Sequence, residues 1–214
     1  MSKERALTLL SMDRAALEVL TREFQTRWNL KVDGWPGPEV RAKIRDLQPA
    51  APTEPPVIPK TRAEVKRVYG TFHWTSSRGR YIDIDDEWED LNIRRFKLHT
   101  GQRRRLHRLV GDEFVTLFRR ACDRSGYTPR SVQTYVPRKI KDEPDSKLSL
   151  HSWGIAIDFD PTLNRYGGKQ KDGQPCPLAV HPEFLQVFRD AGWRCGADWK
   201  TGGGDWMHVE RRAP

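Results

Sequence analysis

The stretch Ser149-Leu150-His151-Ser152-Trp153-Gly154-Ile155-Ala156-Ile157-Asp158-Phe159-Asp160 holds the most informative pattern in this 214-residue chain. From Trp153 onward, large apolar side chains alternate with small or acidic ones, which is the two-residue period of a β-strand. Asp158 therefore shares a strand face with Gly154 and Ala156, whose small side chains leave room for a metal and a substrate. His151 precedes the strand, so a turn must bring its imidazole back toward that face.

A second segment, Gly202-Gly203-Gly204-Asp205-Trp206-Met207-His208, complements the first. The glycines predict a loop, and residues 206–210 predict a short strand from which His208 points inward. His151, Asp158 and His208 together match the three protein ligands of a catalytic zinc site, which keeps its fourth position for water. Asp205 has the opposite strand parity, so we expect it at the strand's entrance, as the general base that takes a proton from that water.

Other interpretations of these segments stay open at this stage. A histidine in either segment alone is more often an ordinary core or surface residue than a metal ligand. Two imidazoles and a carboxylate also accept divalent ions other than zinc. The chain's three cysteines, Cys122, Cys176 and Cys195, form no Cys-x-x-Cys pair, so we leave them out of the metal site and expect no disulfide framework.

The charge of the chain is unevenly distributed. The formal net charge is +9, and residues 60–140 hold 19 lysines and arginines against 10 acidic residues, so the surplus lies there. A basic surface suits an anionic cell wall or membrane as well as nucleic acid. No nucleic-acid motif with fixed spacing is present, so we expect no nucleic-acid partner. Apolar spacing predicts one helix over residues 101–125, with the arginines at 103–105 on its solvated side.

The expected organisation is a small helical domain, a linker and a larger domain. Residues 1–48 show helical apolar spacing, for example at Leu17, Leu20, Phe24 and Trp28. Residues 49–60 are rich in proline, which predicts an extended spacer. Residues 61–214 form the catalytic domain. We expect an α+β fold, with an antiparallel sheet flanked by helices, in a chain that is a monomer.

Two further features concern substrate and compartment. The loop after Asp158 and the tryptophans near the second segment could line a groove, so we assign Asn164, Tyr166 and Trp206 to substrate binding. No apolar run of about 18 residues predicts a membrane span. The charged N-terminus, Met1-Ser2-Lys3-Glu4-Arg5, lacks the apolar core and cleavage site of a secretory signal, which predicts synthesis in the cytoplasm.

The joint pattern Ser-x-His-x-x-Gly-x-Ala-x-Asp and Asp-x-x-His resembles the VanY-like zinc peptidases, which include D-Ala-D-Ala carboxypeptidases and endolysins. The resemblance spans about residues 69–210. It implies zinc as cofactor, peptidoglycan as partner and the stem peptide as substrate, with Ser149 of the motif on the substrate side. The dipeptidase branch carries Glu-x-x-His, whereas Asp205 matches the branch that cleaves the L-alanyl-D-glutamate bond, which is common among phage endolysins.

The same family uses an arginine upstream of the first motif to hold the substrate and its developing oxyanion. Arg138, in Tyr135-Val136-Pro137-Arg138, fits that position, although the family's usual Ser-Gly-Tyr-Arg motif is absent. A guanidinium suits this role because its fixed fork of donors matches a carboxylate or oxyanion.

A second resemblance concerns the N-terminal domain. Residues 30–41, LKVDGWPGPEVR, are similar to the turn of the peptidoglycan-binding three-helix domain, with Val40 in place of the usual threonine. The combined expectation is an endolysin-like enzyme that is made in the host cytoplasm and lyses the wall from the periplasmic side. The alternatives are a carboxypeptidase that trims terminal D-alanine, a non-catalytic wall-binding virion protein and a nucleic-acid binder.

Overall fold

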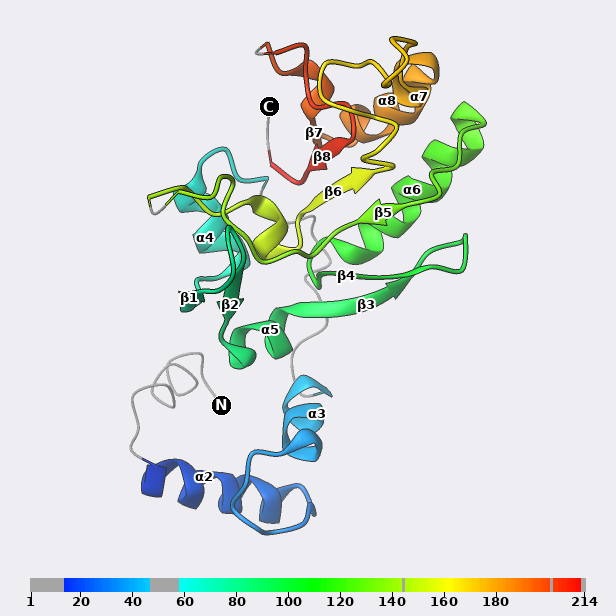
Figure 1. Cartoon of the computed structure of the whole chain (residues 1–214). Coiled ribbons are helices and arrows are strands. Elements are labelled where there is room, and N and C mark those ends of the chain that lie inside the picture. Colours follow the sequence, from blue (N-terminus) through cyan, green and yellow to red (C-terminus); the bar gives the residue numbers. More distant parts are fainter. Residues whose placement is uncertain (1–13, 47–57, 144, 201, 213–214) are drawn as a thin grey trace. The chain divides into compact units, whose positions relative to one another are not determined.

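The computed structural model describes residues 14–46, 58–143, 145–200 and 202–212 (Figure 1). Internal contacts divide the chain into two compact units, Met1–Ala50 and Ala51–Pro214. Among the described residues, no helix is long and apolar enough to span a membrane. Most of the predicted linker, residues 49–57, lies outside the described residues.

The described part of the first unit, residues 14–46, contains the helices α2 (Arg14–Arg27) and α3 (Pro38–Asp46). The turn between them is held by the side chain of Gln25, which is almost fully buried. Its amide oxygen accepts hydrogen bonds from the backbone N–H groups of Asp33 and Gly34, at 3.2 and 2.9 Å. Gly34 has a φ of 75°, in the left-handed region that favours glycine. The Asp33-Gly34 pair therefore lies at a sharp bend within residues 30–41, the stretch that resembles a peptidoglycan-binding turn.

The second unit combines short helices with small antiparallel sheets, which confirms the predicted α+β class. Its helices are α4 (Arg62–Tyr69), α5 (Asp86–Asn92), α6 (Gly111–Ser125), α7 (Pro177–Val180) and α8 (Pro182–Asp190). The 3₁₀ turns η2 (Leu150–Trp153) and η3 (Gly196–Asp198) lie between strands. Two hairpins pair β1 (Trp74–Ser76) with β2 (Ile82–Ile84), and β3 (Ile93–Lys97) with β4 (Arg103–His107). The main sheet has the order β5 (Val132–Gln133), β6 (Ala156–Phe159), β8 (His208–Glu210) and β7 (Arg194–Cys195).

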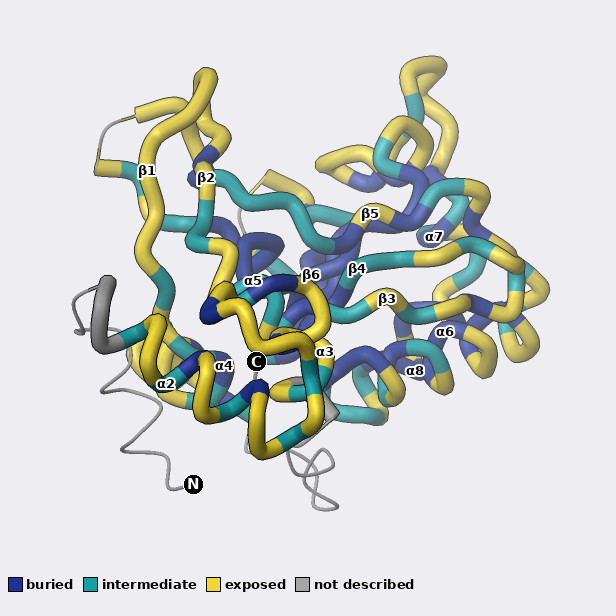
Figure 2. Tube along the Cα trace, turned by 90° about the horizontal axis from the view of Figure 1, so that it is seen from below, coloured by how far each residue is buried: buried dark blue, intermediate teal, exposed yellow. Residues whose placement is uncertain are grey.

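Strand β6 separates the hydrophobic core from the polar centre. The ring of Phe159 packs against Phe118 of α6 and Phe184 of α8, with ring centroids 5.9 and 4.9 Å apart. Successive strand residues face opposite sides of a sheet, so Asp158 faces away from these helices. All four residues of β6 are buried, and Figure 2 shows this buried strand in dark blue. The alternation therefore distinguishes a core face from a second, polar face that is also buried.

The prediction of one helix over residues 101–125 is wrong in its first part. Residues 103–107 form strand β4, which pairs with β3 in the register Lys97↔Arg103 to Ile93↔His107, and the helix begins only at Gly111. Leu106 lies in strand β4 and is fully buried, and Val110 is the buried N-cap residue of α6. These two residues continue the apolar spacing of α6 by coincidence, which is why helical periodicity extended the predicted helix too far.

Candidate metal centre

The position of His151 is set by a short 3₁₀ turn before β6. Ser149 caps this turn, because its hydroxyl accepts a hydrogen bond from the His151 backbone N–H at 3.4 Å. The ring Nδ1 of His151 lies 2.7 Å from the carbonyl oxygen of Thr134. A carbonyl can only accept, so Nδ1 carries a proton, and Nε2 is the ring nitrogen that faces Asp158. That Nε2 is buried and has no hydrogen-bond partner.

Asp158 lies between the two imidazoles. Its Oδ1 is 2.8 Å from Nδ1 of His208, and its Oδ2 is 3.1 Å from Nε2 of His151. The second contact is close but does not have hydrogen-bond geometry, since Nε2 remains without a partner. Burial alone would raise the pKa of Asp158, but the two histidines hold it well below its usual value. The carboxylate is therefore ionised over the neutral range.

His208 faces a carboxylate on each side of its ring. Strand pairing places it directly opposite Asp158, and Nε2 lies 3.1 Å from Oε2 of Glu210. Burial lowers the pKa of His208, but hydrogen bonds to Asp158 and Glu210 raise it to about 10 in the metal-free protein. Glu210 orients the ring and leaves Nδ1 as the atom directed at Asp158. Arg194 in turn lies 3.3 Å from Glu210.

The three side chains fit a metal ion. One donor atom from each of His151, Asp158 and His208 lies within 4.8 Å of the others, and no other such group of three occurs in the described ranges. Ligand bonds of about 2.0–2.2 Å to a tetrahedral zinc place neighbouring donors about 3.3 Å apart. The Asp158 oxygens lie 3.1 and 2.8 Å from the facing ring nitrogens of His151 and His208. The partnerless Nε2 of His151 is a further sign of fit, because a buried ring nitrogen otherwise finds a hydrogen bond.

Asp205 lies beside this donor group but is not part of it. Its backbone makes two hydrogen bonds. The Asp205 N–H donates to the Gly196 carbonyl at 2.8 Å, and the Asp205 carbonyl accepts from the His208 N–H at 3.1 Å. Its Oδ1 is buried and has no hydrogen-bond partner. Burial and the nearby charge of Asp158 raise the pKa of Asp205, and the two histidines and Arg138 oppose that shift. A carboxylate in these surroundings is suited to taking up a proton.

Arg138 lies near the same two carboxylates, Asp158 and Asp205. Its backbone carbonyl accepts hydrogen bonds from Ser149 and from the Ser152 hydroxyl, at 2.9 and 3.0 Å. Burial and the neighbouring Arg80 lower the pKa of its guanidinium, whereas Asp158 and Asp205 raise it. The guanidinium is therefore within electrostatic range of both carboxylates. It forms no ion pair with any residue that the structure describes, so its donors are available.

The residues assigned to substrate binding differ in accessibility. Tyr166 is 54% exposed and is bridged through its backbone to Asp205, beside the centre. Trp206 is half-buried, and its indole N–H donates to Gly203 at 3.0 Å. Asn164 is fully buried, and its amide is bonded to Phe159, Tyr127 and Leu178, so its burial argues against contact with a peptide. Ser149 is also buried, and its hydroxyl caps the turn that carries His151.

The role expected for Gly154 needs correction. A side chain at this position would not point toward the metal centre, because its Cβ would lie 2.8 Å from the backbone nitrogen of His107. Gly154 has a φ of 66° and ends the turn η2, where its N–H donates to the carbonyl of His151. Its small size therefore serves the sharp turn between His151 and β6 and the close approach of β4.

Comparison with known families supports the same chemistry. Residues 143–211 match the family model described as D-alanyl-D-alanine carboxypeptidase. The match covers about a third of the chain and includes His151, Asp158, Asp205 and His208, but it begins after Arg138. It supports a peptidase of the zinc-dependent family that acts on peptidoglycan. No curated protein and no solved structure matches the chain significantly.

Several residues at the centre escaped the sequence interpretation. Glu210 was detectable, since it follows His208 by two positions and so shares its strand face. Thr134 contributes only its backbone carbonyl, which any residue type could supply. Tyr81 lies in a separate hairpin, and its bridge to Arg138 depends on long-range packing. Gly196 lies against Asp205 and His208, but no local motif marks it.

Proposed function

We propose that this protein is a zinc-dependent peptidase that hydrolyses the stem peptide of peptidoglycan and thereby lyses the bacterial wall. The observation that carries the proposal is the convergence of His151, Asp158 and His208 on one buried point beside Asp205. Three donors with a neighbouring, partnerless carboxylate oxygen match the needs of metal-assisted hydrolysis.

The residues divide the chemistry between them. Zinc, when bound, supplies Lewis-acid activation of a water and of the scissile carbonyl. Asp205 takes a proton from the water on its unbonded oxygen and then gives it to the leaving amine. Its raised pKa favours this double role, because a base that is too weak would not accept the proton. Glu210 and the carbonyl of Thr134 keep the two imidazoles oriented throughout.

Arg138 and Tyr81 define the substrate side of the centre. The two residues face each other in a backbone bridge, so their side chains emerge from neighbouring positions. The Tyr81 ring is half exposed, and the Arg138 guanidinium has no ion-pair partner among the described residues. We assign Arg138 to the developing oxyanion or a substrate carboxylate, and Tyr81 to the wall of the peptide groove.

The bond we propose is the one between L-alanine and D-glutamate. Support comes from Asp205, since the resembling branch with Asp-x-x-His cleaves there. The second candidate is removal of terminal D-alanine, which the description of the matching family model favours. We further propose an endolysin-like role in phage infection, action from the periplasmic side of the wall, and wall binding by the N-terminal unit.

The decisive experiment digests purified sacculi and identifies the released fragments by mass spectrometry, with and without a chelator. Cleavage between L-alanine and D-glutamate that stops on chelation and returns with zinc is the expected result. Release of terminal D-alanine alone would select the carboxypeptidase. An absence of cleavage by protein with bound zinc would contradict both and favour a wall-binding protein.

A further inference from the structure

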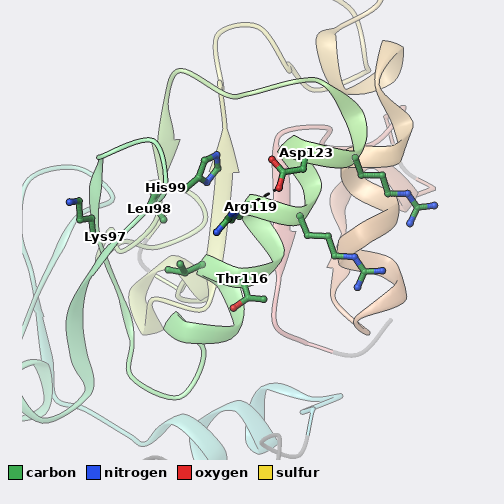
Figure 3. A pocket seen from close by; sticks show the side chains of 9 residues that line it. Lys97, Leu98, His99, Thr116, Arg119 and Asp123 are labelled. Carbon is green, nitrogen blue, oxygen red and sulfur yellow. Dashed lines mark ion pairs between the residues drawn. The ribbon is translucent and has the colours of Figure 1, made fainter.

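A hollow lies away from the metal centre, between the end of the β3–β4 hairpin and helix α6 (Figure 3). Its volume is about 940 Å³, and none of its lining residues belongs to the metal centre. Figure 3 shows His99 from the hairpin and Arg119 and Asp123 from the helix around it. The hollow is shallow and widely open to solvent, so a long chain molecule could lie across it.

The lining of the hollow is strongly basic. It includes Lys97, Arg119, Arg120 and Arg124, against the single acid Asp123. Arg119 lies 3.8 Å from Asp123, and Arg124 lies 3.4 Å from Asp190 outside the lining. Lys97 and Arg120 are exposed and have no ion pair within the described part of the chain. The hollow thus carries a net positive charge with two cations that no acid compensates.

The adjacent hairpin adds to this charge at a cost in stability. Lys97 stands directly opposite Arg103 across the two strands, and Arg95 stands opposite Arg105. Like charges in such cross-strand positions repel each other and weaken the hairpin. Arg105 is compensated by an ion pair with Glu89, but Lys97 and Arg103 are exposed and have none among the described residues. An anionic ligand over the hairpin end would relieve that repulsion.

The uncharged part of the lining narrows the class of ligand. Leu98 is buried, Val115 is half-buried, and the His99 ring packs against the buried Phe118 at 5.2 Å. The lining offers no exposed phenylalanine, tyrosine or tryptophan, which single-stranded nucleic acid would use for base stacking. It also offers no exposed large apolar side chain for insertion into a membrane. The Thr116 hydroxyl donates to the Asp112 carbonyl at 3.0 Å, so toward a ligand its oxygen can still accept. Cations with such an acceptor suit a flexible chain of phosphates and alcohols.

We propose that this hollow binds a polyol-phosphate polymer of the bacterial envelope, with its phosphates held by Lys97 and Arg120. The polymer would hold the enzyme at the wall independently of the peptide in the metal centre. Binding at two sites on one meshwork raises the local concentration of substrate. The proposal does not depend on which peptide bond is cleaved, and it can be tested without measuring hydrolysis.

The test measures binding of the full-length protein to immobilised poly(glycerol phosphate) over a range of salt concentrations. The variant Lys97→Glu/Arg120→Glu is compared with Lys66→Glu/Arg67→Glu, whose residues are exposed on α4. Both double variants lower the formal net charge from +9 to +5, so they differ only in where the charge is lost. If the first variant fails to fold, Lys97→Gln/Arg120→Gln with Lys66→Gln/Arg67→Gln as its control asks the same question.

We expect the hollow variant to bind about tenfold or more weakly, with a salt dependence reduced by about two phosphate contacts. The α4 variant should stay within about twofold of the wild-type protein, and both should hydrolyse soluble stem peptide normally. Equal losses in the two variants would overturn the site, because they would reflect net charge alone. The ligand class would be overturned if DNA or anionic phospholipid vesicles bound as tightly as the polymer or more tightly, and if the hollow variant weakened that binding to the same degree. An absence of polymer binding would also overturn it.

Discussion

Replacing Gly196 with alanine should disturb Asp205, the proposed catalytic base, and His208, a proposed metal ligand, together. A Cβ at this position would lie 2.4 Å from the carbonyl oxygen of Asp205, 3.0 Å from its Cβ and 3.1 Å from the Cβ of His208. Gly196 has ordinary backbone angles, since it is not among the glycines with positive φ. The effect of the substitution is therefore steric and does not arise from backbone strain.

The size of the effect follows from these distances. Non-bonded atoms pack best at about 3.5–4.0 Å, so the Asp205 carbonyl must retreat by about 1 Å. That carbonyl accepts from the His208 backbone N–H, so His208 moves with it. Overpacking of this kind costs about 1–3 kcal/mol of stability. A displacement of about 1 Å at reacting groups can lower turnover about 100-fold.

The assay combines denaturant unfolding, zinc affinity by chelator competition, and turnover of a soluble stem peptide. Gly111→Ala is the matched control, because its Cβ would lie 2.1 Å from the Phe96 ring, outside the metal centre, and its φ is also ordinary. Both variants should lose stability, but only Gly196→Ala should also lose zinc affinity and turnover. Wild-type zinc affinity and turnover in Gly196→Ala would refute the claim that this packing positions Asp205 and His208.

Three further outcomes are expected. Because Asp158 and Glu210 raise the pKa of His208 to about 10 against the effect of burial, zinc must displace a proton from it. Apparent zinc affinity should then rise up to about tenfold per pH unit between about pH 6.5 and 8.5, and a flat profile by chelator competition would contradict this. Tyr81→Ala should raise KM for the stem peptide several-fold while bound zinc and kcat stay nearly constant; an unchanged KM would remove Tyr81 from the groove. Asp160→Ala should lower the free energy of unfolding by about 1–3 kcal/mol, measured with denaturant. The reason is that the Asp160 carboxylate accepts hydrogen bonds from Tyr127, Arg130 and Ser131. A loss below about 0.5 kcal/mol would show that these bonds are not needed.

The sequence could predict the donor group because its parts are local. The strand period places Asp158 on one face of β6, and the short turn immediately before the strand supplies His151. The pairing that sets His208 opposite Asp158 is long-range, since 50 residues separate them. Only the chemical complementarity of the two segments, two imidazoles with a carboxylate, indicated that they meet.

Other features were beyond local patterns. The hairpin β3–β4 was missed because Leu106 and Val110 extend the apolar spacing of α6 in the sequence although they belong to different elements. Asn164 lies in a polar loop whose position suggested substrate contact, but its amide instead holds that loop to the core. Whether a polar side chain faces a ligand or the protein interior depends on tertiary packing, which a single sequence does not reveal.

The most direct test of the central claim is the zinc content of purified variants. The account predicts one zinc per chain in the wild-type protein and in Asp205→Asn, which should lose turnover about 100-fold or more. It predicts little or no zinc in His151→Ala and His208→Ala, because each removes one of three donors. Loss of zinc from Asp205→Asn equal to that in the histidine variants would contradict the separation of base and ligands, and full zinc in His151→Ala or His208→Ala would contradict the metal centre itself.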